Sequence, residues 1–560
     1  MDFKSRRQWL YASLAFLFVA LGQAVSVPIF AFIAASFAYV LFWESLSKVE
    51  SKFMRAVWSG VWFTAVQMVQ LSWMTATDYQ GPYIYALLLI LCLGMACQFA
   101  ALTILFVGKG RLTLGQVFGG ASFWVLMEWS RLFLLTGFLW NPSAMALTAN
   151  HYSLQVASLL GIYGLSFWVI FTNLLVLRLW RGGLKISRAI VCLLIIVLPY
   201  TFGWFHSRHH SQKMEESGKK MSVALVHTAL TPDEKMPNPN QNNPYIQAFL
   251  QWQDILVLLK KYNLDNVEVI VFPESLVAFG AKNPFYPASV VQQTFQAILG
   301  KSFLEKLPPL EEPFSVQVKD QNGNQIWQVS NAYWAQAISN CFGADLIVGL
   351  DDTDREGAGI RKSYNAAFHF SPNVKAYGRY EKQILIPGSE YIPFPWVASI
   401  AAKYGIQGSF DTGESAKVFL TSQKVPFGIA ICSEEIYGHR MRENRLLGAE
   451  LLISMHNDVW FPHSTLASQH FQHGLVRSVE NGIPLIRSTN VGITGAVDSL
   501  GRVLLTHGEL WKEDVLLLSL PRYSYQTIYS KWGDIPIITF SFVNVLLFFS
   551  IRMFRKRKVT

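Results

Sequence analysis

Three apolar segments of this 560-residue chain end in side chains that can do chemistry. The run "VPFGIAIC" ends at Cys432, "VEVIVFPES" carries Glu274 near its end, and "LLISMHND" closes on Asn457 and Asp458. A thiolate attacks carbonyl carbons, and a nearby carboxylate can take the thiol proton as the attack begins. Cys432 and Glu274 are therefore the residue types of a covalent acyl-transfer centre.

Each ending also has a structural interpretation. A lone cysteine after an apolar run is more often a packed thiol, and a strand-terminal glutamate can cap a neighbouring helix. No CxxC pair or Cys/His spacing indicates zinc or a disulfide framework among the five cysteines. Four histidines lie close together in the sequence, but carboxylates with metal-ligand spacing are not evident. We therefore expect no metal site at His456, His463, His470 and His473.

The elements that must position these residues lie in a polar region, residues 211–530. Short β-branched runs alternate there with longer amphipathic stretches, which predicts an α/β or layered sandwich fold. Residues 281–343, with "KLPPLEEP", form a long excursion that we interpret as an insertion. The expected helices are 242–262 and 463–481, and the expected strands are 222–230, 267–275, 344–352, 365–372, 427–435, 451–458 and 484–490.

The rest of the chain has the composition of a membrane protein. The sequence is 51% hydrophobic and 14% aromatic, with only 15% charged residues. The net charge of +10 does not indicate nucleic acid, because the basic end "RMFRKRK" directly follows an apolar run and suits an anionic lipid surface. Seven apolar segments of near-spanning length precede the polar region and an eighth follows it. They lie near 8–24, 26–44, 54–74, 84–107, 115–138, 154–178, 187–205 and 535–554.

Basic residues occur on every second loop between these segments. "KSRR", "ESLSKVESKFMR", "GKGR" and "RLWRGGLKISR" alternate with loops that hold no Lys or Arg, such as "TATDYQGPY". The positive-inside rule then predicts that both termini face the cytoplasm and that residues 207–530 lie outside it. In the alternative, residues 1–24 are a cleaved signal peptide, but cleavage would leave the following loops with the wrong parity.

The ordered motifs of the polar region resemble those of the nitrilase superfamily. They are "FPES", "YEKQILIPGSEYIPFP", "ICSEE" and the long block from "NDVWFPHS" to "RSTNVGIT". More narrowly, with seven spans before them and one after, they look like the bacterial apolipoprotein N-acyltransferases. This resemblance covers nearly the whole chain. It implies a multi-span helical membrane region (1–210), a nitrilase-like αββα sandwich domain (211–530) and a C-terminal span with a basic tail (531–560).

The resemblance also implies roles for single residues. It gives Glu274, Lys382 and Cys432 as the catalytic set, with Glu390 and Glu434 supporting it and Trp460 and Glu480 near the substrate pocket. In this set Lys382 would stabilise the oxyanion and favour the thiolate.

The chain departs from the family's pattern at two short places. Ser433 stands where the family commonly has tyrosine, and Gly388-Ser389 stands where it has Phe-Gly. Both departures concern the acyl-chain contacts and the loop near the site, and the three reacting residues remain.

The implied function is acyl transfer from a phospholipid to the α-amino group of a diacylglyceryl-cysteine in an apolipoprotein, through a thioester on Cys432. We expect a monomeric multi-pass enzyme of the bacterial cytoplasmic (inner) membrane, its catalytic domain on the periplasmic side, with no cofactor, metal or nucleic acid. Two alternatives are a membrane-tethered amidohydrolase acting on a small amide and a transporter or scaffold with an inert external domain.

Overall fold

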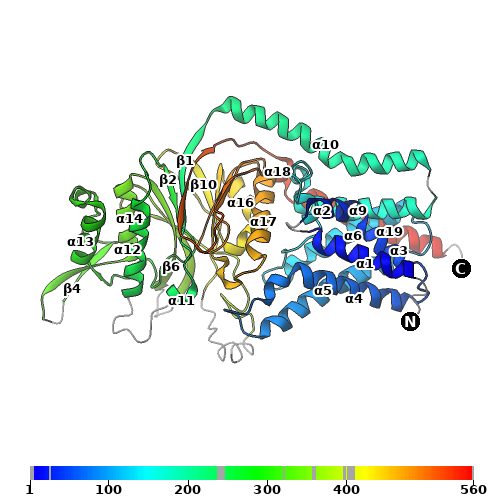
Figure 1. Ribbon diagram of the computed structural model, residues 1–560, viewed down its shortest axis with the longest axis horizontal. Helices are drawn as coiled ribbons and strands as arrows, with labels where there is room; N and C mark the ends of the chain where they lie inside the picture. Colours follow the sequence, from blue (N-terminus) through cyan, green and yellow to red (C-terminus); the bar gives the residue numbers. More distant parts are fainter. Residues whose placement is uncertain are drawn as a thin grey trace. The chain divides into compact units, whose positions relative to one another are not determined.

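The computed structural model describes residues 6–23, 27–183, 185–235, 246–319, 322–355, 361–394, 399 and 410–557 (Figure 1). The chain forms two compact units. The helical unit comprises residues 1–215, 461–482 and 525–560. The sheet unit comprises residues 216–460 and 483–524. Because 461–482 groups with the helical unit, one helix from the polar part of the sequence packs with the apolar helices.

Each of the eight apolar segments of the sequence contains helix in the helical unit, although the described helix of the segment 115–138 ends at residue 133. Among the described residues, five stretches are long and apolar enough to cross a membrane: Pro28–Ser45, Tyr83–Phe106, Ala157–Arg181, Ile186–Ser217 and Ile535–Phe554. The other three segments are helices of 16, 19 and 17 residues. The elements are α1 (Arg6–Leu21), α2 (Pro28–Ile33), η1 (Ala34–Ala38), α3 (Tyr39–Ser45), α4 (Lys52–Gln70), η2 (Ser72–Thr75), α5 (Tyr83–Phe106), α6 (Leu114–Ser130), η3 (Arg131–Phe133), α7 (Met145–Thr148), α8 (His151–Leu154), α9 (Ala157–Arg181), α10 (Ile186–Ser217), α17 (Leu466–Asn481), α18 (Ile528–Trp532) and α19 (Ile535–Arg557).

A buried asparagine satisfies a break in the second apolar segment. The segment passes through a π-helical turn, η1, which weakens the regular backbone bonding. Asn173 of α9 donates to the carbonyls of Ala34 and Ala35 at 3.0 Å each and accepts from the Tyr39 N–H at 3.1 Å. Since lipid offers no hydrogen bonds, a polar side chain of a neighbouring helix has to replace them.

The sheet unit contains two six-stranded sheets and one small sheet. The first has the order β15-β1-β2-β6-β7-β8, the second β14-β13-β12-β11-β10-β9 and the small one β3-β5-β4. Strands β1, β2 and β6 run parallel, as do β10, β11 and β12. The strands are β1 (Lys220–His227), β2 (Val269–Val271), β3 (Tyr286–Pro287), β4 (Ser315–Lys319), β5 (Gln325–Val329), β6 (Asp345–Arg355), β7 (Arg361–Phe370), β8 (Gly378–Glu381), β9 (Val418–Leu420), β10 (Pro426–Ile431), β11 (Leu451–His456), β12 (Leu485–Thr489), β13 (Gly495–Val497), β14 (Val503–Thr506) and β15 (Asp514–Pro521).

The two large sheets pack face to face with helices outside them. Val223 of β1 and Val271 of β2 share one buried cluster with Ile429 of β10 and Ile453 of β11. A second cluster packs helices α12 and α14 on the outer face of the first sheet, and a third packs α16 on the second sheet. The layers are therefore those of an αββα sandwich. The parallel strands are buried on both faces, so they read as continuous apolar runs. The helices and turns are α11 (Pro232–Lys235), α12 (Ile246–Lys260), α13 (Ala288–Leu299), η4 (Lys301–Lys306), α14 (Asn331–Phe342), η7 (Cys432–Ile436), α16 (Gly438–Leu446) and η8 (Asp458–Trp460).

The excursion at 281–343 contributes two different parts. Its first part forms α13, η4 and the small sheet. Its last part is α14, whose Trp334 is fully buried and stacks on Trp252 of α12 with ring centroids 5.9 Å apart. The helix α14 thus belongs to the sandwich itself.

Candidate active site

Glu274 is placed by the backbone that follows β2. This segment continues beside β6, with the N–H of Phe272 donating to Ile347 O and that of Leu276 to Gly349 O, both at 2.8 Å. A Cβ at position 349 would lie 2.6 Å from Glu274 Cα, so only glycine permits this approach. The close contact of two backbone segments therefore fixes where the Glu274 side chain begins.

Lys382 directly follows β8 and is placed by the pairing of β8 with β7. Its N–H donates to the Asn365 carbonyl at 2.9 Å, and its own carbonyl accepts from the Gly413 N–H at 2.8 Å. Its side chain is fully buried. Backbone bonds on both sides thus hold the residue that carries the ammonium.

Cys432 stands at the turn between β10 and η7. Its φ is +52°, in the left-handed region that residues with a side chain seldom adopt. The residue is 8% exposed. Strained backbone conformations cluster at active sites. At the end of a buried strand, such a conformation can direct the side chain differently from the regular alternation of the strand.

The structure brings the predicted charged residues together. Lys382 Nζ lies 3.3 Å from Glu274 Oε1 and 2.7 Å from Glu390 Oε1. Burial alone disfavours the ammonium, but the negative charges of Glu274 and Glu390 outweigh it, with the thiolate form of Cys432 acting in the same direction, and the pKa of Lys382 is raised well above its usual value. Lys382 is therefore a cation held between two carboxylates.

The electrostatics keep the Cys432 thiol protonated at rest. Burial raises its pKa well above the usual range, and the carboxylates of Glu274 and Asp458 add to this against the opposing charge of Lys382. Lys382 acts in the expected direction, toward the thiolate, but burial and the carboxylates prevail. The thiol therefore needs a base that takes its proton during the attack rather than before it.

Glu434 ties the backbone near Lys382 to the backbone near Cys432. The residue is 1% exposed, and burial raises its pKa although several donors oppose the shift. Its carboxylate accepts hydrogen bonds from both segments, namely from the N–H groups of Gln383, Ile384 and Ile431 at 2.7, 3.3 and 2.8 Å and from the Tyr380 hydroxyl at 2.9 Å. Glu434 thus holds the backbone of Lys382 and the backbone of Cys432 in place relative to each other.

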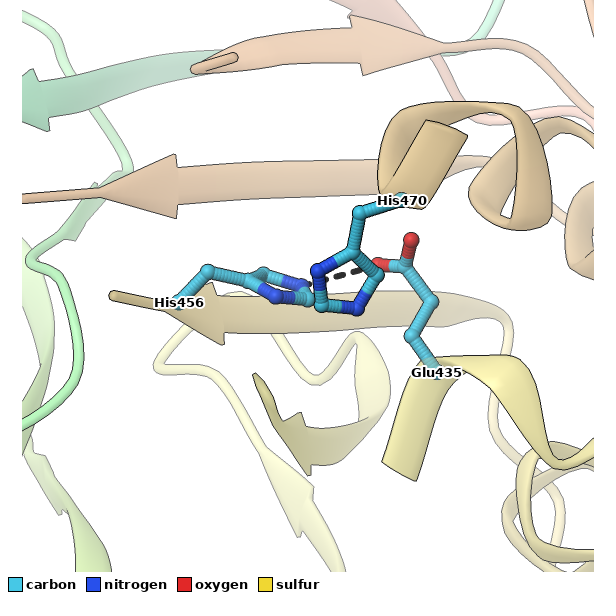
Figure 2. Close-up of side chains that lie close together, drawn as sticks. All are labelled: Glu435, His456 and His470. Carbon is cyan, nitrogen blue, oxygen red and sulfur yellow. Dashed lines mark hydrogen bonds and ion pairs between the residues drawn. The ribbon is translucent and has the colours of Figure 1, made fainter. Parts of the chain in front are cut away.

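A second buried charge network lies at the ends of β11 and β12. The Arg487 guanidinium bonds Glu435 Oε1 at 2.8 Å and Asp458 Oδ2 at 2.9 Å. Figure 2 shows Glu435 beside His456, whose Nε2 lies 3.0 Å from Glu435 Oε2 and 2.6 Å from Ser454 Oγ. Since Glu435 shares the turn η7 with the thiol, this network anchors that turn, and Asp458 contributes charge rather than a reacting group.

The other histidines of the sequence cluster belong to the helical unit. His470, also drawn in Figure 2, packs its ring on Trp140 at a centroid distance of 5.1 Å. His473 Nε2 lies 2.9 Å from the Trp140 carbonyl. Within this unit the two rings serve to pack α17 against the loop that carries Trp140.

Two further residues, Trp460 and Glu480, were expected near the substrate pocket. Trp460 ends η8 and is 37% exposed. Glu480 is fully buried in the helical unit, where it accepts from the Ile162 N–H at 2.8 Å and pairs with Arg477 at 2.9 Å. Gly161, at φ +64°, breaks α9 just before this N–H, so Glu480 caps the second half of that helix.

Sequence reasoning missed two residues of the site. Asn365 lies inside β7 and bonds both Glu274 and Glu390, at 2.7 and 3.0 Å. Arg487 lies inside β12. Asn365 begins the buried half of β7, and Arg487 follows the two apolar residues that begin β12. A polar side chain next to buried apolar residues is the signal that the sequence offered.

Comparisons with known proteins found two family models, relatives along most of the chain and similar solved structures. A family model for carbon-nitrogen hydrolases matches residues 239–529, and the apolipoprotein N-acyltransferase N-terminal domain matches residues 8–175. The apolipoprotein N-acyltransferase of Chlamydia muridarum is 30% identical over 562 residues, 96% of each chain. That of Geobacter metallireducens is 28% identical over 422 residues, 74% of this chain and 70% of that one. Solved nitrilase-type structures also match, such as Saccharomyces cerevisiae Nit3, with 16% identity, a TM-score of 0.34 and coverage of 57% of this chain and 95% of that one.

The αββα sandwich and the matched family model define a carbon-nitrogen hydrolase of the nitrilase type. Within this class, the added helical region and the full-length relatives are decisive. The chain belongs to the apolipoprotein N-acyltransferase family.

Proposed function

We propose that this protein transfers a fatty acyl chain from a phospholipid to the α-amino group of the diacylglyceryl-cysteine that begins an apolipoprotein. The reaction runs in two steps through a thioester on Cys432. The single observation that carries the proposal is the fully buried Lys382 ammonium between Glu274 and Glu390, close enough to Cys432 to interact electrostatically with its thiolate form. This set holds a base, an oxyanion donor and a nucleophile.

In the first step Glu274 takes the proton of the Cys432 thiol while sulfur bonds to the ester carbonyl carbon of the donor. The negative charge that develops on the carbonyl oxygen is stabilised by Lys382, and such a donor contributes about 3–4 kcal/mol to lowering the barrier. The tetrahedral intermediate then breaks its bond to the lysophospholipid oxygen. That oxygen leaves with the proton that Glu274 received.

In the second step the free amine of the acceptor attacks the thioester carbonyl. Glu274 accepts a proton from the attacking nitrogen, the carbon–sulfur bond breaks, and the sulfur recovers the proton as a thiol. The products are an N-acylated lipoprotein and the free enzyme. Water must be kept from the thioester between the two steps, which a buried Cys432 supports.

The helical region supports the choice of lipid-anchored substrates. Both the phospholipid and the diacylated acceptor lie in a bilayer, and five helical stretches in the described part of the chain are long and apolar enough to cross one. We therefore assign residues 1–210 to membrane anchoring, 211–530 to catalysis and 531–560 to a last span with a cytoplasmic tail. The enzyme works as a monomer in the bacterial inner membrane.

The alternating charge of the loops predicts the topology of the protein. We expect a reporter that works only outside the cytoplasm to be active when fused after residue 530. The same reporter fused after residue 560 should be silent. The opposite pattern would reverse the orientation of the catalytic region.

An assay with defined lipids tests the function. The purified protein is given a phospholipid and a synthetic diacylated lipopeptide, and the products are analysed by mass spectrometry. We expect a third acyl chain on the lipopeptide nitrogen. Release of ammonia from a small amide, without acyl transfer, would favour the amidohydrolase alternative. Full cellular function of a Cys432→Ala variant would favour the inert scaffold.

A further inference from the structure

Asn365 is the neutral member of the buried catalytic set. It lies in the middle of β7, is 3% exposed, and its Nδ2 group donates to Glu274 Oε1 at 2.7 Å and to Glu390 Oε1 at 3.0 Å. Rotating the amide by 180° would turn Oδ1 toward two carboxylate oxygens, so this orientation is the one that the surroundings allow. One amide thus uses both of its N–H bonds on the two carboxylates.

The hydrogen bonds distribute unevenly over the four carboxylate oxygens. Lys382 bonds the same two Oε1 atoms as Asn365 does, at 3.3 Å on Glu274 and 2.7 Å on Glu390. Glu390 Oε2 accepts from the Ile386 N–H at 2.8 Å. No described residue donates a hydrogen bond to Glu274 Oε2. Within the described part of the chain, Glu390 therefore has both oxygens occupied, whereas Glu274 keeps Oε2 available.

We propose that Asn365 is a positioning residue that locks Glu274 through Oε1, so that Oε2 is the oxygen that exchanges protons with Cys432 and with the acceptor amine. The inference rests on the proposed roles of Glu274 and Cys432. In the step that it concerns, the S–H bond breaks, its proton forms a bond with Oε2, and the sulfur electron pair bonds the donor's carbonyl carbon. The amide moves no proton itself.

A neutral donor suits this position better than a charged one. The groups that face Glu274 and the thiol are the Lys382 cation and the carboxylates of Glu390 and Asp458. A second cation here would hold the Glu274 carboxylate less basic, and a third carboxylate beside Lys382 would make one of the three take up a proton. An amide supplies two hydrogen bonds and leaves the charge of the set unchanged.

The test compares Asn365→Asp and Asn365→Ala in the full-length enzyme, which is purified in detergent micelles without phospholipid and then mixed with the phospholipid donor. The rate of Cys432 acylation in a single turnover is measured from pH 5 to pH 9. For Asn365→Ala we expect the acylation rate to fall by about 100-fold, because a Glu274 side chain that is free to rotate no longer holds Oε2 toward the thiol. The phospholipid concentration needed for the half-maximal rate should change little. For Asn365→Asp we expect the acid limb of the profile to move up by about one pH unit or more.

Asn340→Asp is the matched control. Asn340 is a buried asparagine of α14 that bonds the Lys306 carbonyl at 2.9 Å and makes no contact with the catalytic set. This variant should keep the wild-type acid limb. If the two aspartate variants have the same profile, or if Asn365→Ala stays within about threefold of the wild-type rate, the inference is wrong.

A third variant tests the role of Asn365 even if Asn365→Asp and Asn365→Ala fold poorly. Asn365→Ser retains a smaller donor, so if the other variants fold poorly it should still keep the wild-type acid limb with a reduced rate. A wild-type rate in Asn365→Ser would contradict the positioning role.

Glu274→Gln and Cys432→Ser distinguish a failure of the proposed function from a failure of the role of Asn365 alone. If these two remain active, the proposed function fails. If they are inactive while the Asn365 variants behave as wild type, only the role of Asn365 fails.

Discussion

The Cys432→Ser variant should lose acyl transfer by about 10⁴-fold or more, as expected for an enzyme without its nucleophile. A serine hydroxyl is far less acidic than a thiol, and the buried carboxylates already oppose an anion at this position. Glu274 alone cannot make that oxygen an effective nucleophile. The rate is measured as the appearance of triacylated lipopeptide from phospholipid and diacylated lipopeptide.

Cys341→Ser provides the matched control for this prediction. Cys341 is a second buried cysteine of the sheet unit, in α14, and burial raises its pKa to about 12. Its thiol lies in the hydrophobic core between α14 and the first sheet rather than beside Lys382. This variant should keep its transfer rate. Equal losses in the two variants would mean that the thiol of Cys432 has no special role.

Replacing Lys382 with methionine should have the second-largest effect. The change removes the oxyanion donor, which costs about 10²–10³-fold in rate. It also leaves Glu274 and Glu390 buried without their cation, so one of them takes up a proton and the base is impaired. We expect a total loss of about 10⁴-fold in the single-turnover acylation of Cys432.

The thermal stability of the variants separates the loss of the oxyanion donor from the loss of the buried positive charge. Breaking a buried ion pair by removing one partner typically costs about 3–5 kcal/mol of folding free energy. Lys382→Arg keeps the charge, so it should unfold near the wild-type temperature while remaining impaired in rate, because the planar guanidinium does not fit the ammonium position. Lys261→Met, at an exposed ion pair with Glu513, should change neither property. A Lys382→Met enzyme with wild-type kinetics would exclude the lysine from catalysis.

The residues at the strand ends could be predicted from the sequence to a large extent. Glu274 and Cys432 each follow a run that is apolar at every position, which is how a parallel strand buried on both faces reads. The sequence alone could not show that these ends meet, because they come from different sheets. Lys382 lies in a loop after a short strand, and only its resemblance to a family motif indicated its role.

Asn365 and Arg487 could not be predicted because their partners depend on strand pairing. Asn365 reaches the carboxylates through the register of β7 against β6 and β8, and a shift by one residue would point it to the opposite face. The sequence also did not predict that α17 packs with the apolar helices. Its Gln469 and Glu480 are polar, as on a surface helix, but both are buried and bond the backbones of α4 and α9 in the helical unit.

The most direct measurement is the mass of the Cys432 peptide after the full-length enzyme has met phospholipid alone. With no acceptor present, the proposed first step should leave the donor's acyl chain on that peptide, and hydroxylamine should remove it as expected for a thioester. Adding the diacylated lipopeptide should then discharge the adduct and produce one triacylated lipopeptide for each acyl-enzyme consumed. An enzyme that transfers the chain without ever carrying it on Cys432 would contradict the two-step mechanism.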